Sequence, residues 1–150
     1  RLFDAVSAIL NLCTDNCYEA EAPMKLEAIA EENIDSAYSF EMNDGMVSFS
    51  PAIRGIVEDL SNDEDKGVIS ARFHNTVANA VWQVCEEIRS AEKHNKVALS
   101  GGSFQNRYLT RRVIKLLKDN GFDVYINQSV PPNDGGISLG QLAIAAKKMK

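Results

Sequence analysis

Long apolar runs are absent from this 150-residue chain, and only two histidines, four prolines and three cysteines occur in it. A helix that crosses a bilayer needs about 20 consecutive apolar residues, so we expect no membrane contact. No basic segment followed by an apolar stretch opens the chain, so no secretory signal is visible. Cys13, Cys17 and Cys85 match neither a disulfide framework nor a zinc site. These absences predict a cytoplasmic protein with reduced thiols.

A basic excess is also lacking, because the net charge is −5. Proteins that bind the backbone of nucleic acids usually carry such an excess, so we expect no nucleic-acid partner. A hydrophobic content of 45% and a charged content of 25% are typical of a soluble globular protein. We therefore treat residues 1–150 as a single domain. The basic residues that gather late in the chain fit the solvated faces of amphipathic helices: Arg107, Arg111, Arg112, Lys115, Lys118, Lys147, Lys148 and Lys150.

The first two thirds of the chain are predicted to be mainly helical. Apolar residues recur every three or four positions in residues 2–12, 23–30, 51–60 and 68–88, and the last of these should be the central packing helix. Between the second and third helices, two runs of β-forming residues flank Asn43-Asp44-Gly45. An Asp-Gly turn between such runs predicts a β-hairpin.

The last third alternates between strand and helix. Residues 96–100 and 122–126 read as short strands, separated by a helix that ends at Asn120-Gly121. A final helix runs to about Met149. Strand–helix–strand order predicts two adjacent parallel strands with a right-handed crossover. The predicted fold class is α/β, helix-rich, with a small partly parallel sheet and an inserted hairpin.

The loop after the first predicted strand is the strongest local signal for a binding site. It reads Ser-Gly-Gly-Ser-Phe-Gln-Asn over residues 100–106. Gly101 and Gly102 let the backbone turn tightly and approach a bound group. The helix that begins nearby is expected to offer unpaired N–H groups that suit a phosphate, and Asn106 could donate to a phosphate or ribose oxygen. The alternative is a plain Gly-Gly turn that binds nothing, since no Walker-type lysine follows.

A second loop, residues 130–136, precedes the final helix and reads Val-Pro-Pro-Asn-Asp-Gly-Gly. Asp134 is placed to cap that helix, and it could equally bind a divalent cation. Because both loops follow adjacent parallel strands, they should emerge at the same edge of the sheet, where α/β proteins bind ligands. This convergence favours a binding role for the pair.

The remaining candidates are ambiguous from sequence alone. Asp4 could accept from a ribose hydroxyl or be merely exposed, and the acidic stretch that holds Glu19 and Glu21 reads most simply as a solvated connection. His74 should be a packed helical histidine, because no HExxH-like pair accompanies it. Ser100 and Ser103 lack the G-x-S-x-G elbow of hydrolases.

Taken in order, five segments resemble the last part of the HypF family of carbamoyltransferases. The Ser-Gly-Gly-x-Phe-Gln-Asn and Pro-Pro-Asn-Asp-Gly-Gly segments are together highly specific, and the resemblance covers nearly the whole chain. The five segments are residues 1–6 (RLFDAV), 18–22 (YEAEA), 72–75 (RFHN), 99–106 (LSGGSFQN) and 130–140 (VPPNDGGISLG).

The resemblance implies the C-terminal part of an actin-like (ASKHA, RNase H-like) domain similar to that of TsaD. It implies a carbamoyl-adenylate intermediate, made elsewhere in the full protein from ATP and carbamoyl phosphate. The carbamoyl group would then pass to the C-terminal cysteine of a HypE-like partner in [NiFe]-hydrogenase maturation. On this resemblance Asp4 would contact the ribose, Glu21 would lie near the nucleoside, and Asp134 would bind a metal. The phosphate side would be held by Gly101, Gly102 and Asn106.

Two positions depart from the family pattern, and part of the site is expected elsewhere. Ala20 stands where the family usually has glycine, and Ser103 where it usually has valine. The family's paired metal-binding histidines would lie upstream of Arg1, so a divalent metal (zinc, iron or magnesium) would be shared with ligands outside this chain. We therefore expect no carbamoyltransferase turnover from the chain alone.

Two other functions stay open from sequence alone. The first is a non-catalytic ASKHA-like interaction module that self-associates, because an incomplete sheet exposes an edge that proteins normally cover. The second is a TsaD-like tRNA-modifying relative, which the acidic balance does not favour.

Overall fold

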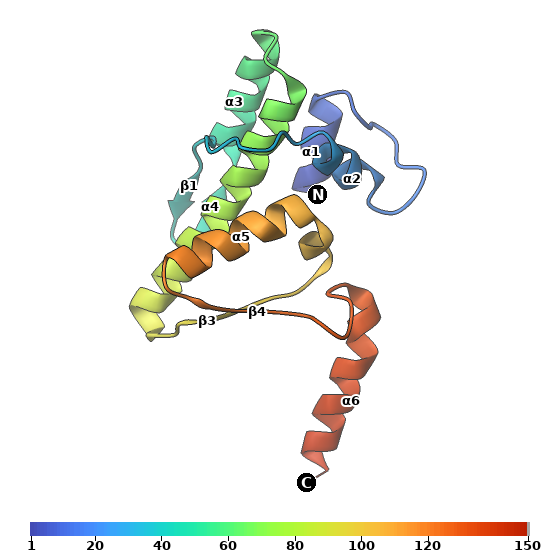
Figure 1. Ribbon diagram of the computed structural model, residues 1–150, viewed down its shortest axis with the longest axis vertical. Helices are drawn as coiled ribbons and strands as arrows, with labels where there is room; N and C mark the ends of the chain where they lie inside the picture. Colours follow the sequence, from blue (N-terminus) through green and yellow to red (C-terminus); the bar gives the residue numbers. More distant parts are fainter. Residues whose placement is uncertain (150) are drawn as a thin grey trace.

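The computed structural model describes residues 1–149 as six α-helices, two short 3-10 helices and four strands (Figure 1). The first half of the chain holds α1 (Leu2–Ile9), α2 (Glu21–Ala28), β1 (Glu41–Asn43), β2 (Met46–Ser48), α3 (Ser50–Ser61) and α4 (Lys66–Glu92). The second half holds β3 (Lys96–Leu99), η1 (Gly102–Gln105), α5 (Arg107–Asp119), β4 (Asp123–Ile126), η2 (Asp134–Gly136) and α6 (Ile137–Lys148). The predicted α/β class is confirmed, with helices dominating.

The long helix α4 runs through the middle of the molecule and divides the core in two (Figure 1). Asp65 begins it, because its carboxylate accepts from the backbone N–H groups of Gly67 and Val68. Phe3 and Val77 pack against both clusters of buried side chains. One cluster joins α4 to α1, α2 and α3 through Val6, Leu10, Leu26, Ile56, Ile69 and Phe73. The other joins it to α5 and the β3–β4 sheet through Ala78, Leu99, Leu109, Val113, Leu117 and Phe122.

The middle of α4 also binds the extended segment that leads from α2 to the hairpin. The Asn75 amide donates to the carbonyl oxygens of Ile34 and Ser36, at 2.8 and 2.9 Å. The Thr76 hydroxyl oxygen accepts from the backbone N–H of Tyr38 at 2.8 Å. These bonds satisfy the buried Asn75 amide nitrogen and the buried Thr76 hydroxyl, whereas the Asn75 side-chain oxygen has no partner among the described residues.

An ion-pair network fastens the same segment to α3. Arg72 donates to the Asp59 carboxylate at 2.7 Å and lies 3.2 Å from that of Glu64. The Tyr38 hydroxyl also donates to Asp59, at 2.6 Å. Burial, followed by this carboxylate, holds the pKa of Tyr38 well above its usual range. Arg72 and Asn75, the first and last residues of the motif at residues 72–75, therefore have a structural role.

The strands β3 and β4 pair in parallel, as predicted, with Lys96 opposite Asp123 and Leu99 opposite Ile126. Helix α5 connects them and covers one face, where Val113, Leu117 and Phe122 are buried. The loops that follow the two strands meet, because the Gly101 N–H donates to the Pro132 carbonyl oxygen at 2.6 Å. This contact confirms that both loops emerge at one edge of the sheet.

Helix α6 extends away from the rest of the molecule and buries no side chain (Figure 1). Its exposed apolar residues are Ile137, Leu139, Leu142 and Ile144, with exposed fractions between 53% and 68%. The face of the sheet opposite α5 is open too, and Tyr125 is exposed on it, since its neighbour Val124 packs on the α5 side. Among residues 1–149 no helix is long and apolar enough to cross a membrane.

Three expectations about local structure were wrong. The apolar stripe predicted for the central helix continues to Ile88, but that side chain is 49% exposed. Asp134 does not cap the final helix, because α6 follows Gly136 without a side-chain cap, and Asn133 caps η2 instead by accepting from the Gly135 N–H. The acidic stretch after α1 is not wholly solvated, since Glu21 is 6% exposed and begins α2.

Candidate functional site

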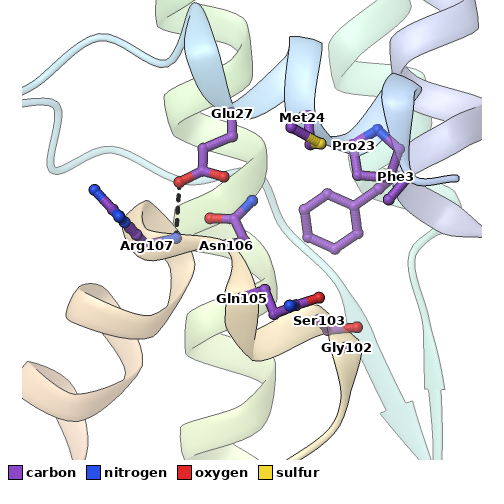
Figure 2. Close-up of a pocket in the computed structure, with 10 residues that line it drawn as sticks. Phe3, Pro23, Met24, Glu27, Gly102, Ser103, Gln105, Asn106 and Arg107 are labelled. Carbon is purple, nitrogen blue, oxygen red and sulfur yellow. Dashed lines mark hydrogen bonds between the residues drawn. The ribbon is translucent and has the colours of Figure 1, made fainter. Parts of the chain in front are cut away.

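A cavity of about 520 Å³ lies between the first two helices and the loop that follows β3. Its apolar wall is formed by Phe3 of α1 and by Pro23 and Met24 of α2. Figure 2 shows these side chains facing the opposite wall, which is built by η1 and the start of α5. The polar lining residues are Glu27, Ser103, Gln105, Asn106 and Arg107, and Ala20 and Gly102 complete the set. A mostly apolar cleft with a few convergent polar groups is the usual form of a small-molecule site.

The start of α2 is held in place by polar side chains beside the cavity. The Glu21 carboxylate accepts from the backbone N–H of Cys17 at 2.6 Å and pairs with Lys25 at 2.7 Å. The Lys25 ammonium, followed by the Cys17 N–H, lowers the pKa of Glu21. Asn16 links α1 to α2, because its amide donates to Asp4 and its carbonyl oxygen accepts from the Ala22 N–H. Both predicted acidic residues are therefore part of this corner.

Neither Asp4 nor Glu21 lines the cavity, although each is adjacent in sequence to a residue that does. Phe3 immediately precedes Asp4 in α1, and Ala20 immediately precedes Glu21. Ala20 has φ +61° and ψ +19°, a left-handed conformation in which glycine costs least. This backbone gives a physical reason for the glycine that the family pattern has at position 20.

The first turn of α5 has no free N–H group to offer a ligand, contrary to expectation. One oxygen of Glu27 accepts from the N–H groups of Arg107 and Tyr108, at 2.7 and 3.4 Å, and Figure 2 draws the first of these bonds. The Asn106 side-chain oxygen accepts from the Leu109 N–H at 2.8 Å. Side chains thus satisfy the donors that a helix N-terminus leaves open.

Donors without an acceptor lie one turn earlier, in η1. Within the described part of the chain, the backbone N–H groups of Gly102 and Ser103 make no hydrogen bond. Both residues line the cavity, and a Cβ built on Gly102 would meet nothing within 4 Å. Gly101 before them has φ +103°, which a residue with a side chain rarely adopts. Consecutive free N–H groups form a concave donor site for anionic oxygens.

The side-chain amide of Asn106 is hydrogen-bonded to a buried histidine, His74. Its nitrogen lies 2.9 Å from Nε2 of His74, a residue with no exposed surface. Of the predicted nucleotide-binding residues, Gly102 and Asn106 line the cavity. Gly101 contributes the bond to Pro132 that joins the two loops.

Asp134 is exposed and begins η2, on the loop that Pro132 ties to Gly101. No group of three or more His, Cys, Asp or Glu residues gathers anywhere in residues 1–149. The described residues therefore do not fit a complete metal centre, and Asp134 is a single carboxylate. The three cysteines are free in the structure, with Cys13 buried and Cys17 exposed.

The sequence interpretation missed part of this cavity. Phe3, Pro23 and Met24 lie in stretches that the sequence predicts only as helices, and nothing local distinguishes a cavity wall from a core face. Glu27 was not singled out, because its partners lie about 80 positions later in the chain. Gln105 lies inside the motif at residues 100–106, but nothing in the sequence indicates that its side chain lines the cavity.

Residues 1–141 match the family model described as "Carbamoyltransferase, Kae1-like Domain, second subdomain". The chain belongs to the HypF family of carbamoyltransferases. It is similar to the carbamoyltransferase HypF of Synechocystis sp., with 34% identity over 148 residues, which cover 95% of this chain and 18% of that protein. The HypF of Rhodobacter capsulatus is 32% identical over 157 residues, 100% of this chain and 20% of that protein.

The fold agrees with a solved HypF structure. A crystal structure of full-length HypF in the phosphate- and nucleotide-bound form matches with a TM-score of 0.92 and 44% identity, covering 99% of this chain and 20% of that one. The chain thus spans about a fifth of the length of its HypF relatives. It is the helix-rich C-terminal part of an ASKHA-like α/β domain.

Proposed function

We propose that this chain is the nucleotide-binding segment of a HypF carbamoyltransferase and holds ATP or carbamoyl-adenylate in the cavity between α2 and η1. The observation that carries the proposal is the division of that cavity into two chemical halves. Phe3, Pro23 and Met24 form a wall suited to a planar base. Gly102 and Ser103 bring free backbone donors suited to phosphate oxygens.

Two further features support a nucleotide as the ligand. A HypF structure with 44% identity is described as phosphate- and nucleotide-bound. In addition, the polar lining residues other than Glu27 come from the segment that follows the parallel strand β3, at the edge where α/β proteins bind nucleotides. Asp4 and Glu21 would act near the ribose and nucleoside by way of the corner that they build with Asn16.

In the full protein the carbamoyl group would pass to the C-terminal cysteine of a HypE-like partner during [NiFe]-hydrogenase maturation. Asp134 would supply one ligand to a divalent metal whose other ligands come from outside these 150 residues. Because the described residues hold no cluster that fits a metal, we expect no carbamoyl transfer by the chain alone.

The test is calorimetric titration of the chain with a non-hydrolysable ATP analogue. Gly102→Gln would place a side chain in the cavity without strain, because nothing lies within 4 Å of the new Cβ. We expect this variant to lose binding, whereas Gly140→Gln, equally unobstructed on α6, should bind as the wild type does. Equal binding by both variants would place the nucleotide elsewhere.

The second candidate is a non-catalytic module that self-associates, and the observation in its favour is helix α6. Leu139, Leu142 and Ile144 are each more than half exposed on that helix. Sedimentation of the wild type and of Leu142→Glu would decide. A wild-type dimer that the charge converts to monomer supports the module, and a wild-type monomer excludes it.

A further inference from the structure

His74 lies beneath the cavity, where it contacts both of the walls. Its ring centre is 5.4 Å from that of Phe3, on the apolar wall, and 5.2 Å from that of Tyr108, in the first turn of α5. The side chain has no exposed surface, so a ligand in the cavity does not reach it directly. Any influence on the ligand must pass through Asn106, whose amide nitrogen is 2.9 Å from His74 Nε2.

The partners of the imidazole ring fix where its proton lies. Nδ1 is 2.7 Å from the carbonyl oxygen of Ser70, and a carbonyl oxygen can only accept, so Nδ1 carries the proton. A neutral ring then has a lone pair on Nε2, which accepts from the Asn106 amide N–H. The ring is therefore a neutral link between the backbone of α4 and the cavity.

The same logic fixes the orientation of Asn106. Its nitrogen must face His74, and its oxygen must face the Leu109 N–H, from which it accepts at 2.8 Å. If the amide were rotated by half a turn, its oxygen would face the lone pair of His74 Nε2, and its NH₂ group would face the Leu109 N–H. Asn106 thus keeps one amide hydrogen and one oxygen lone pair for a ligand, each in a set direction.

We propose that His74 is a positioning residue that locks the Asn106 amide in the orientation needed to bind the nucleotide. This role rests on the proposed function of the cavity. The neighbouring residues Arg72, Asn75 and Thr76 do not share this role, because their hydrogen bonds go to residues 34–38 and to α3.

Protonation of His74 would release the lock, because Nε2–H would then point at the Asn106 amide hydrogens. The groups that face the ring from other elements are the Glu27 carboxylate of α2 and the Tyr108 side chain of α5, and Phe3 brings no charge. Burial lowers the pKa of His74, and it outweighs both the Ser70 carbonyl and Glu27, which favour the charged form. The lock therefore holds at neutral pH and opens in acid.

Three variants separate positioning from simple packing. His74→Gln places an amide oxygen where Nε2 lies, so it accepts from Asn106 but does not titrate. His74→Phe keeps the aromatic volume and removes both hydrogen bonds. Thr76→Val is the control, because Thr76 is equally buried in α4 but bonds to the segment at residue 38 and does not line the cavity.

The readout is the affinity for a non-hydrolysable ATP analogue from about pH 8 down to about pH 4, a window that extends below the ordinary histidine range because burial lowers the pKa of His74. Wild-type affinity should fall in acid, and His74→Gln should bind like the wild type at neutral pH without that fall. His74→Phe should bind about 3- to 10-fold more weakly, as expected for a lost hydrogen bond. Thr76→Val should match the wild type in affinity and in pH profile.

A second measurement does not depend on the ligand or on how well His74→Phe folds. Histidine resonances in NMR report the protonated nitrogen and the pKa of His74, and His94→Ala identifies the other imidazole. Asn106→Asp sets a carboxylate against Nε2 and should raise the pKa of His74. An unchanged pKa, or a proton on Nε2 in the neutral wild type, would overturn the lock.

The outcomes of the titration are also distinct. A wild type that binds while His74→Phe binds equally well, or while His74→Gln keeps the acid fall, overturns the positioning role alone. A wild type that binds no nucleotide refutes the proposed function, and the positioning role with it.

Discussion

Replacing Ala20 by glycine should stabilise this protein, although the same change usually does the opposite. Ala20 precedes α2 at φ +61°, and its carbonyl oxygen accepts from the Met24 N–H at 3.0 Å. The left-handed conformation costs a residue with a Cβ about 1–2 kcal/mol. Glycine removes that cost but loses about 0.4–1 kcal/mol through the greater freedom of its unfolded chain. The net gain should be about 0.5–1 kcal/mol.

The matched control is Ala5→Gly, in the middle of α1. Ala5 is exposed and has ordinary helical geometry, so glycine there should cost about 0.5–1 kcal/mol. For a chain of this size each kcal/mol moves Tm by about 2–4 °C, so the two variants should shift in opposite directions by about 2 °C each. Urea unfolding followed by circular dichroism gives the two free energies. If both variants lose stability equally, the left-handed conformation of Ala20 carries no cost that glycine can relieve, and the prediction is wrong.

Two further changes test the corner beside the cavity and the projecting helix. Glu21→Gln should destabilise the protein at neutral pH, because the lowered pKa of Glu21 means that its charged form favours the fold. The stabilisation by charged Glu21 is fully present above its ordinary pKa of 4.5, and it is lost as the pH falls through the lowered pKa of the folded state. The urea midpoints of Glu21→Gln and the wild type should therefore converge in acid. Glu19→Gln, at an exposed position, is the control. Leu142→Glu should leave the free energy of unfolding within about 0.5 kcal/mol of the wild type, since the side chain is 68% exposed; a larger loss in thermal unfolding would mean that α6 packs against the body.

Regular elements with strong apolar spacing could be predicted from the sequence. The helices around Phe3, Ile56 and Phe73, the hairpin at Asp44-Gly45 and the parallel strands that end at Leu99 and Ile126 all appear where the pattern indicated. Each of these signals is local, because it depends on residues within one or two turns of each other. The meeting of the Gly101 and Pro132 loops followed from the strand order alone.

Contacts between distant segments could not be predicted in this way. Glu27 caps a helix that begins at Arg107, and Asn75 binds a segment about 40 residues earlier. Such pairs depend on the tertiary arrangement, and the residues involved look like ordinary surface glutamate or helical asparagine in sequence. The left-handed backbone at Ala20 was hidden for a related reason, because alanine gives no sign of a strained turn.

The position of α4 has a consequence for how the protein loses its structure. Each of the two apolar clusters uses one stretch of this helix, and Phe3 and Val77 touch both. Melting one cluster therefore removes packing from residues that the other cluster depends on. The two halves should therefore unfold as one cooperative unit, although one draws on the start of the chain and the other on its last third.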